Sequence, residues 1–353
     1  MQAPSIGIGG AAPVNDGEVN LYLTPEGTGQ RWFDASRRVI FVNGMLNSGD
    51  DHRKSALALS VLRACGVVGV YNKTDGFWRD LGQCITDKLK LSGVQSGSMF
   101  DFATWERIVE DAYRAELRRR PGLDKRDFVG DLIKANPATH ALYALMVGRG
   151  GIDAGTPIYC HSQGNLVTSN ALTAVALAMG AASVHGLVVN SYGSPARYWP
   201  AGLNRTNNAY TFDPVSWLDL RVDLSSSKVG FKAAHGFDTY VQQDGEFVVN
   251  RFRWGSFGMT ASMDEDGLAE FCVGLGDNTP RLRGIFDRLE SAHWTDSDDV
   301  ALAYVNKLSD IRLRTLARID PAFIRQLVRL LKSGWTSRAE KRAIERLENA
   351  LRA

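Results

Sequence analysis

The chain has 353 residues, of which 44% are hydrophobic and 23% charged, and its 41 basic side chains nearly balance its 39 acidic ones. This length and composition are typical of a globular protein with one large domain, or with one large domain and a smaller attachment. The formal net charge of +2 excludes the broad basic field of a nucleic-acid-binding protein, so no nucleic-acid partner is expected.

The cysteines and the apolar runs bear on the compartment. The four cysteines lie far apart, with no Cys-x-x-Cys pair and no zinc-type spacing, so we expect buried thiols, a reducing compartment and no metal site. No stretch reaches the ~20 apolar residues that span a bilayer. Residues 1–13 lack the basic start and sustained apolar core of a Sec signal peptide. We expect a protein that is cytoplasmic as synthesised, and export by a route without a cleaved signal peptide stays open.

The first half of the chain predicts an arm, two strands and a helical segment. Residues 1–37 are rich in Gly, Pro and polar side chains and predict at most a short strand or hairpin. Residues 39–43 form a β-branched, two-sided apolar run, which is typical of a buried parallel strand. A helical pattern over 51–64 and a short apolar run over 67–71 follow. Residues 77–150 have a mainly helical pattern, strongest over 102–117 and 125–147.

Three further apolar runs predict the next strands. They cover residues 158–160, 187–190 and 209–212, and a helical pattern begins after the first of them. Strands that alternate with helices predict a mostly parallel sheet with helices on both faces.

The end of the chain has a different character. Residues 295–353 are helical in pattern throughout and predict a small appendage of short helices. Residues 320–321 (Asp-Pro) predict an N-cap followed by proline at the first helical position. Gly334 lies where a C-terminal glycine cap belongs. Ser337 and Glu340 have the spacing of a capping box.

The strongest functional signal is the sequence Cys-His-Ser-Gln-Gly-Asn at residues 160–165. It lies between a predicted strand and a predicted helix, which is the context of a nucleophile elbow. In such a turn the hydroxyl of Ser162 projects above the sheet edge, where a base can reach it. The alternative is an ordinary Ser-Gln-Gly turn between strand and helix.

A serine nucleophile needs a base and an acid downstream in the chain. Asp213 follows the strand predicted over 209–212 and precedes a proline that ends the strand, so we expect it to be the acid. His235 stands beside a glycine in a loop 22 residues later and is the expected base. His293 is the alternative base, and an Asp-Pro turn without a catalytic role is the alternative for Asp213. Asp219, Asp223 and Asp238 are alternative acids.

The mechanism also needs two backbone N–H groups to bind the oxyanion. Gln163, the residue after the serine, supplies one in an elbow. The second is expected from Met45, because Gly44 permits a sharp turn after the strand at residues 39–43. The alternative is a simple Asn-Gly turn.

With these residues in place, the chain resembles the α/β-hydrolase superfamily, and within it the serine lipases of the class 3 type. The matching motifs are residues 161–164 (His-Ser-Gln-Gly), 192–195 (Tyr-Gly-Ser-Pro), 213–215 (Asp-Pro-Val) and His235. Residues 41–45, 71–74 and 160–165 are also similar to bacterial lipase-type toxin effectors. The resemblance covers residues 38–242. The chain departs from the usual lipase elbow Gly-His-Ser-Leu-Gly-Gly, which separates it from the secreted lipases.

The resemblance implies an α/β-hydrolase fold with three parts. They are an N-terminal arm at 1–37, a catalytic domain at 38–260 with a helical cap-like insertion at about 77–150, and the helical appendage at 295–353. The insertion contains five large apolar side chains: Phe77, Trp78, Met99, Phe100 and Trp105. We expect them to form either an apolar surface for an acyl chain or part of the core.

The implied activity is hydrolysis of carboxylic esters through an acyl-enzyme, with lipid or phospholipid acyl esters as substrates. This mechanism needs no cofactor. An effector of this kind implies transient contact with a membrane and an immunity or delivery protein as partner. Two alternatives stay open: a serine peptidase or amidase on the same fold, and a non-catalytic, hydrolase-like binding module.

Overall fold

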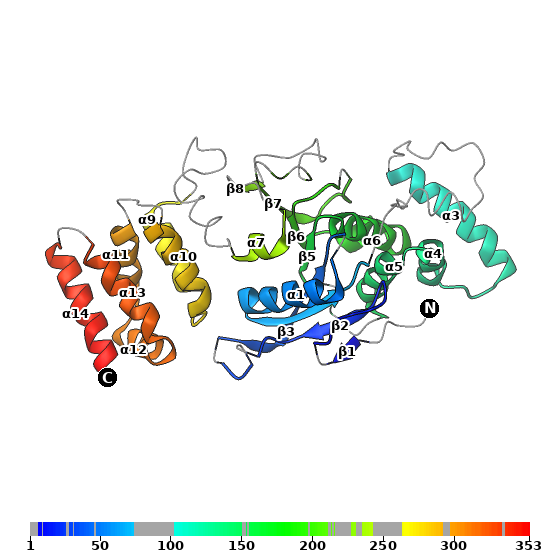
Figure 1. Cartoon of the computed structure of the whole chain (residues 1–353). Coiled ribbons are helices and arrows are strands. Elements are labelled where there is room, and N and C mark those ends of the chain that lie inside the picture. Colours follow the sequence, from blue (N-terminus) through cyan, green and yellow to red (C-terminus); the bar gives the residue numbers. More distant parts are fainter. Residues whose placement is uncertain are drawn as a thin grey trace.

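The computed structural model describes most of the chain. The described residues are 6–8, 10–25, 28–30, 32–45, 47–73, 102–149, 153, 155–196, 198–210, 213, 215, 227–230, 235–242, 263–291, 297–333 and 336–353. Within them an eight-stranded sheet forms the centre, and a separate group of helices lies beside it (Figure 1).

The sheet has the strand order β1-β2-β4-β3-β5-β6-β7-β8. The strands are β1 (Ile6–Ile8), β2 (Val19–Tyr22), β3 (Asp34–Val42), β4 (Cys65–Val70), β5 (Ile158–His161), β6 (Val188–Tyr192), β7 (Asn204–Tyr210) and β8 (Ser227–Gly230). Every neighbouring pair is parallel except β2 and β4. Two strands of the sheet, β1 and β2, thus come from the predicted N-terminal arm.

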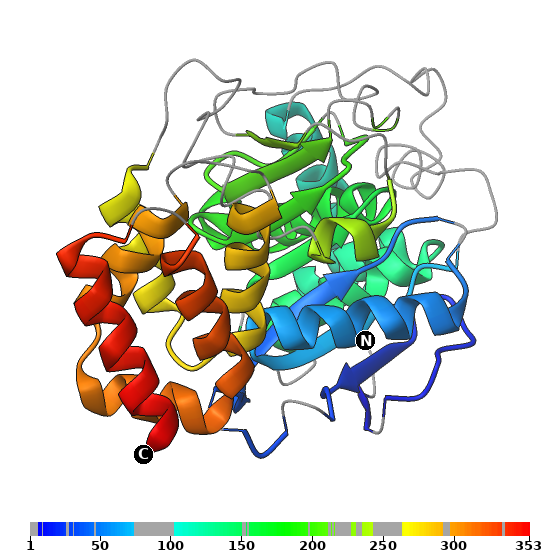
Figure 2. The ribbon, with the colours of Figure 1, turned by 60° about the vertical axis from the view of Figure 1, so that its left-hand side comes forward.

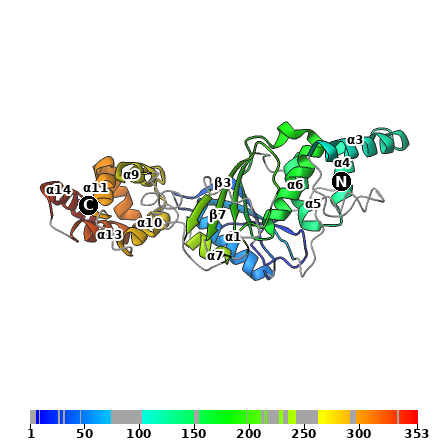
Figure 3. The same cartoon turned by 90° about the horizontal axis from the view of Figure 1, so that it is seen from above.

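The central strands are apolar on both sides because helices cover both faces of the sheet (Figure 3). In β3, Ile40 and Val42 belong to the core beneath helices α4, α5 and α6, whereas Val39 and Phe41 belong to the core beneath α1 and α7. The bounds of these helices are Lys125–Ile133 (α4), Pro137–Ala144 (α5), Gly164–Met179 (α6), Gly49–Arg63 (α1) and Phe237–Gln242 (α7). The predicted mostly parallel sheet with helices on both faces is therefore confirmed.

The predicted helical insertion divides into two parts. Helix α3 (Phe102–Arg119) extends to one side of the sheet, and α4 and α5 pack into the main core against α6. The helix predicted over 125–147 is broken, because Asn136 caps a new helix that has Pro137 at its first position. A short turn, η1 (Leu145–Arg149), follows, in which Gly148 leaves the helical conformation with a φ of 79°. Trp105 is partly buried against the main core. The other four large side chains expected to line the insertion, Phe77, Trp78, Met99 and Phe100, lie outside the described residues.

The C-terminal helices lie together as one group (Figure 2). They share a hydrophobic core of their own. They are α9 (Glu265–Gly274), α10 (Thr279–Ser291), α11 (Ser297–Lys307), α12 (Asp310–Ile319), α13 (Pro321–Leu331) and α14 (Arg338–Arg352). The helical unit thus begins earlier than the predicted residue 295, because Leu268 on α9 and Ile285 on α10 are buried in the same core as Leu327.

Both predicted N-terminal caps of this unit are confirmed. The side chain of Asp320 accepts a hydrogen bond from the N–H of Phe323, and Ser337 and Glu340 form the reciprocal capping box. Gly334 lies outside the described residues. Among the helices that the structure describes, none is both long and apolar enough to cross a bilayer.

Candidate active site

Ser162 lies in a tight turn between β5 and α6. Its φ of 50° is positive, a conformation shared by only one other described non-glycine residue, Ala64. Such a conformation costs on the order of 1–3 kcal/mol and persists only where the surroundings hold it. Two bonds do so: the N–H of Ser162 donates to the carbonyl of Tyr192 at 2.9 Å, and Asn165 Nδ2 donates to the carbonyl of Ser162 at 2.9 Å.

The turn needs a glycine at position 164. A Cβ atom there would lie 2.4 Å from the carbonyl oxygen of Val42. Strand β5 and helix α6 can therefore pack this closely against β3 only without a side chain. The local strand-turn-helix geometry is that of a nucleophile elbow.

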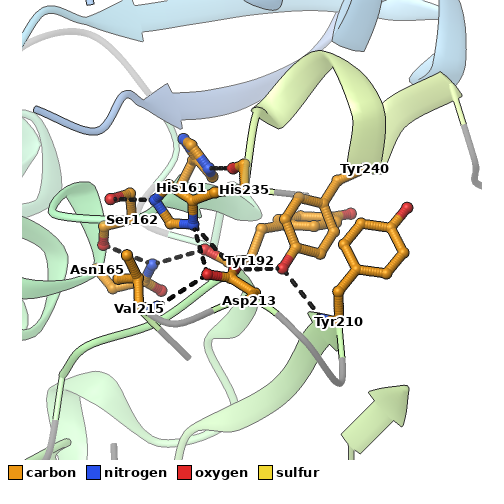
Figure 4. Close-up of polar contacts among 9 residues, drawn as sticks. All are labelled: His161, Ser162, Asn165, Tyr192, Tyr210, Asp213, Val215, His235 and Tyr240. Atoms are coloured by element: carbon orange, nitrogen blue, oxygen red, sulfur yellow. Dashed lines mark hydrogen bonds and ion pairs between the residues drawn. The ribbon is translucent and has the colours of Figure 1, made fainter. Parts of the chain in front are cut away.

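The structure brings Ser162, His235 and Asp213 together (Figure 4). His235 Nε2 lies 2.8 Å from Ser162 Oγ, and His235 Nδ1 lies 3.0 and 2.9 Å from the two carboxylate oxygens of Asp213. Ser162 is 3% exposed and Asp213 is fully buried. With Nδ1–H held by the carboxylate, Nε2 of a neutral His235 is free to accept the serine proton.

Asp213 is stabilised as a carboxylate despite its burial. Burial by itself raises the pKa of this group, but hydrogen bonds from His235, Tyr240 and the N–H of Val215 together hold the pKa below its ordinary value of 3.8. The N–H of Val215 donates to Oδ1 at 2.9 Å, and the hydroxyl of Tyr240 donates to Oδ2 at 2.8 Å. The buried charge is therefore compensated from three directions.

Gly193 makes room for the acid and the base. Its φ is 53°, and a Cβ atom there would lie 2.8 Å from Asp213 Oδ2 and 3.0 Å from His235 Cε1. The site therefore requires a glycine at this position of the motif at 192–195, because a side chain here would separate Asp213 from His235.

Two neighbours of this group were not among the predicted site residues. Tyr240 lies on α7, one turn after His235, and its hydroxyl accepts from the N–H of Tyr210 at 3.2 Å while it donates to Asp213. His161 Nε2 donates to the backbone carbonyl of His235 at 2.5 Å. Burial, reinforced by the nearby His235, lowers the pKa of His161 to about 3, so His161 is neutral and holds the loop that carries the base. Nothing in the spacing of these residues along the chain indicates either contact.

The two predicted oxyanion donors lie beside the serine. A Cβ atom on Gly44 would lie 2.6 Å from Ser162 Cβ and 3.2 Å from Ser162 Oγ, so the peptide that leads to Met45 borders the nucleophile. Gln163 directly follows Ser162. Within the described part of the chain, neither the N–H of Met45 nor that of Gln163 donates to a backbone carbonyl.

The structure does not describe the side chains of the remaining candidates. Asp238 is part of α7, and His293, Asp219 and Asp223 lie outside the described residues. The three described cysteines are buried and unpaired, whereas Cys84 is not described. Among the described residues, no group of three or more His, Cys, Asp or Glu is placed to hold a metal ion.

Comparison with known proteins adds no relative to this geometry: no family model, no curated protein and no solved structure matches the chain. A chain of hydrogen bonds thus joins the buried Asp213, the partly exposed His235 and the buried Ser162 at the carboxyl edge of a mostly parallel sheet, with the serine on a strained turn.

Proposed function

We propose that the chain is a serine hydrolase of the α/β-hydrolase fold that cleaves carboxylic esters through an acyl-enzyme. One observation carries the proposal: His235 lies within hydrogen-bond distance of both Ser162 Oγ and the Asp213 carboxylate, and Ser162 occupies an elbow at positive φ. The sheet supports the proposal, because the order β1-β2-β4-β3-β5-β6-β7-β8 is mostly parallel and the turn with Ser162 follows its inner strand β5.

The geometry suits the two half-reactions of acyl transfer. His235 Nε2 takes the proton of Ser162 as Oγ attacks the ester carbonyl, and the N–H groups of Met45 and Gln163 bind the developing oxyanion. His235 then protonates the leaving alcohol, which departs as the acyl-enzyme forms. A water molecule gives up a proton to the same nitrogen and attacks the acyl group. The bond from the acyl carbon to Oγ then breaks, the carboxylic acid leaves, and Nε2 returns the proton to Oγ of Ser162. Asp213 stabilises the imidazolium that forms in both steps.

Lipid or phospholipid acyl esters are the proposed substrates. This part rests on the motif resemblance to class 3-type lipases and to bacterial lipase-type toxin effectors, because the same three groups serve amide hydrolysis equally well. A role as an antibacterial or host-directed effector rests on the same motifs.

Labelling with a fluorophosphonate probe, followed by mapping of the modified residue, tests the mechanism. We expect the label on Ser162 and none on a Ser162→Ala variant. That variant should lose on the order of 10⁴ to 10⁶ in kcat while it stays folded. Turnover that survives in Ser162→Ala would overturn the proposal.

A substrate panel tests the substrate class. p-Nitrophenyl esters of increasing chain length and phospholipid vesicles, assayed beside peptide amides, should show ester turnover that rises with acyl length. Amide turnover in the absence of ester turnover would favour a peptidase or amidase instead.

A further inference from the structure

A buried polar network lies behind the two proposed oxyanion donors, and Asn43 is its centre. Asn43 Nδ2 donates to the carbonyls of Gly44 and Asn72, each at 2.8 Å. Asn43 Oδ1 lies 2.8 Å from the N–H of Asn72 and 2.8 Å from His52 Nδ1. Asn43 is fully buried, so its amide satisfies all of its hydrogen-bonding capacity inside the protein.

These partners determine the orientation of the Asn43 amide and the state of His52. A backbone N–H can only donate and a backbone carbonyl can only accept, so the amide cannot be flipped. Since Asn43 Oδ1 accepts, His52 must carry its proton on Nδ1. Burial lowers the pKa of His52 to about 3, which keeps the ring neutral. The network is therefore a fixed arrangement of neutral groups.

The bond from Asn43 to the carbonyl of Gly44 determines where the N–H of Met45 points. The carbonyl of Gly44 and the N–H of Met45 belong to one planar trans peptide, in which the two groups point in opposite directions. Because Asn43 holds the carbonyl, the N–H of Met45 is directed away from Asn43. The same peptide borders the nucleophile, since a Cβ atom on Gly44 would lie 3.2 Å from Ser162 Oγ.

The network also reaches the second donor residue. Asn72 Nδ2 donates to Gln163 Oε1 at 3.1 Å, and Gln163 is 2% exposed. The ends of β3 and β4 and the turn after β5 are thus joined by side chains that converge on Met45 and Gln163. Preorganised donors of this kind need no reorientation when the oxyanion forms.

We propose that Asn43 is a positioning residue that orients the Gly44–Met45 peptide for oxyanion stabilisation, and that Asn72 extends this control to Gln163. The proposal rests on the proposed serine hydrolase function. It assigns a role to a buried Asn-Asn-Gln network that the Ser-His-Asp group does not require.

The test compares Asn43→Ala with a matched buried control, Ser60→Ala. Ser60 is fully buried, and its hydroxyl donates to the carbonyl of Cys65 at 2.8 Å and accepts from the N–H of Thr24 at 3.1 Å, at the opposite end of β4. On a soluble p-nitrophenyl ester, Asn43→Ala should lose about 10²-fold in kcat with little change in KM, because an oxyanion contact acts in the transition state. Ser60→Ala should keep the wild-type kcat. An Asn43→Ala protein with wild-type kcat would overturn the proposal.

A double-mutant cycle decides the question if Asn43→Ala does not fold. Asn72→Leu removes the side-chain bond to Gln163 Oε1 while the backbone of Asn72 remains, and Gln163→Met keeps the backbone N–H of Gln163. Each variant should lose about 2- to 10-fold in kcat, and the double variant should lose no more than either single one. Independent losses that multiply, or no loss in either variant, would overturn the proposal.

A wild-type control separates this proposal from the function on which it rests. A wild-type chain that neither hydrolyses esters nor takes the fluorophosphonate label on Ser162 would overturn both. Hydrolysis that depends on Ser162 but is indifferent to Asn43, Asn72 and the Gln163 side chain would overturn the positioning role alone.

Discussion

Removal of the Tyr240 hydroxyl should weaken both the fold and the proposed reaction, because this group donates to the buried carboxylate of Asp213, the proposed acid. In Tyr240→Phe the carboxylate of Asp213 loses a 2.8 Å bond, and the N–H of Tyr210 loses its 3.2 Å acceptor. A hydrogen bond to a charged group contributes about 1.5–3 kcal/mol, so we expect the free energy of unfolding to fall by about 1.5–3 kcal/mol at pH 7. Asp213 keeps its bonds to His235 and Val215, so kcat should fall by only about tenfold, or 1.4 kcal/mol.

The loss of stability should depend on pH, and its sign follows from the pKa of Asp213. The folded protein holds this pKa below 3.8, so the carboxylate stabilises the fold above that pH, and the contribution is lost as the pH falls through the lower, folded value. Without the Tyr240 hydroxyl the folded pKa rises toward the unfolded one. The difference between wild type and Tyr240→Phe should therefore be full above about pH 5 and shrink below about pH 4.

Urea unfolding at a series of pH values, paired with ester kinetics, measures both effects, and Tyr22→Phe is the matched control. Tyr22 is equally buried, but its hydroxyl donates to the neutral carbonyl of Ala11 at 3.3 Å. It should lose only about 1 kcal/mol, at every pH, with unchanged kcat. If Tyr240→Phe behaved like Tyr22→Phe in stability, pH dependence and turnover, the reasoning about the acid would be wrong.

Three further substitutions test the site and the helical unit. Gly193→Ala places a Cβ 2.8 Å from Asp213 Oδ2. It should lower kcat about 10²-fold and lower the free energy of unfolding by about 1–2 kcal/mol. A wild-type kcat would show that this contact does not limit the reaction. His161→Phe removes the bond to the His235 carbonyl and should lower kcat about tenfold. The midpoint of the pH-rate profile should not move, because His161, with a pKa of about 3, is neutral throughout. A shifted midpoint would contradict this. Leu327→Ala leaves a cavity in the C-terminal core and should lower the free energy of unfolding of that unit by about 2–5 kcal/mol, measured by thermal or urea unfolding. Fluorophosphonate labelling of Ser162 should stay intact. Loss of labelling in a folded protein would mean that the helical unit supports the site.

The sequence by itself determines the features of this protein that depend on neighbouring residues. A two-sided apolar run predicts a buried strand, as in β3, and Asp320 or Ser337 predicts a helix start because a side-chain cap needs only the next turn. The elbow is likewise local: a small residue, a serine and a glycine between strand and helix. Chain order and loop position then select Asp213 and His235 as candidate partners of Ser162.

Elements that depend on a distant partner are poorly defined by the sequence. Strand β7 begins at Asn204, five residues before the predicted strand, because a run of polar residues pairs with the backbone of β6. Backbone hydrogen bonds between strands carry no hydrophobic signal. The sequence also does not indicate that the helical unit begins at α9, because only the shared core shows which helices belong together.

Contacts across the fold are decided by the tertiary structure alone. Tyr240 meets Asp213 from 27 residues away, His161 meets the carbonyl of His235 from 74, and Asn72 meets Gln163 from 91. None of these distances along the chain has a preferred value, because strand order and helix packing place the groups in space. The sequence thus identifies the candidate reacting groups, and the packed sheet decides which buried side chains hold them in position.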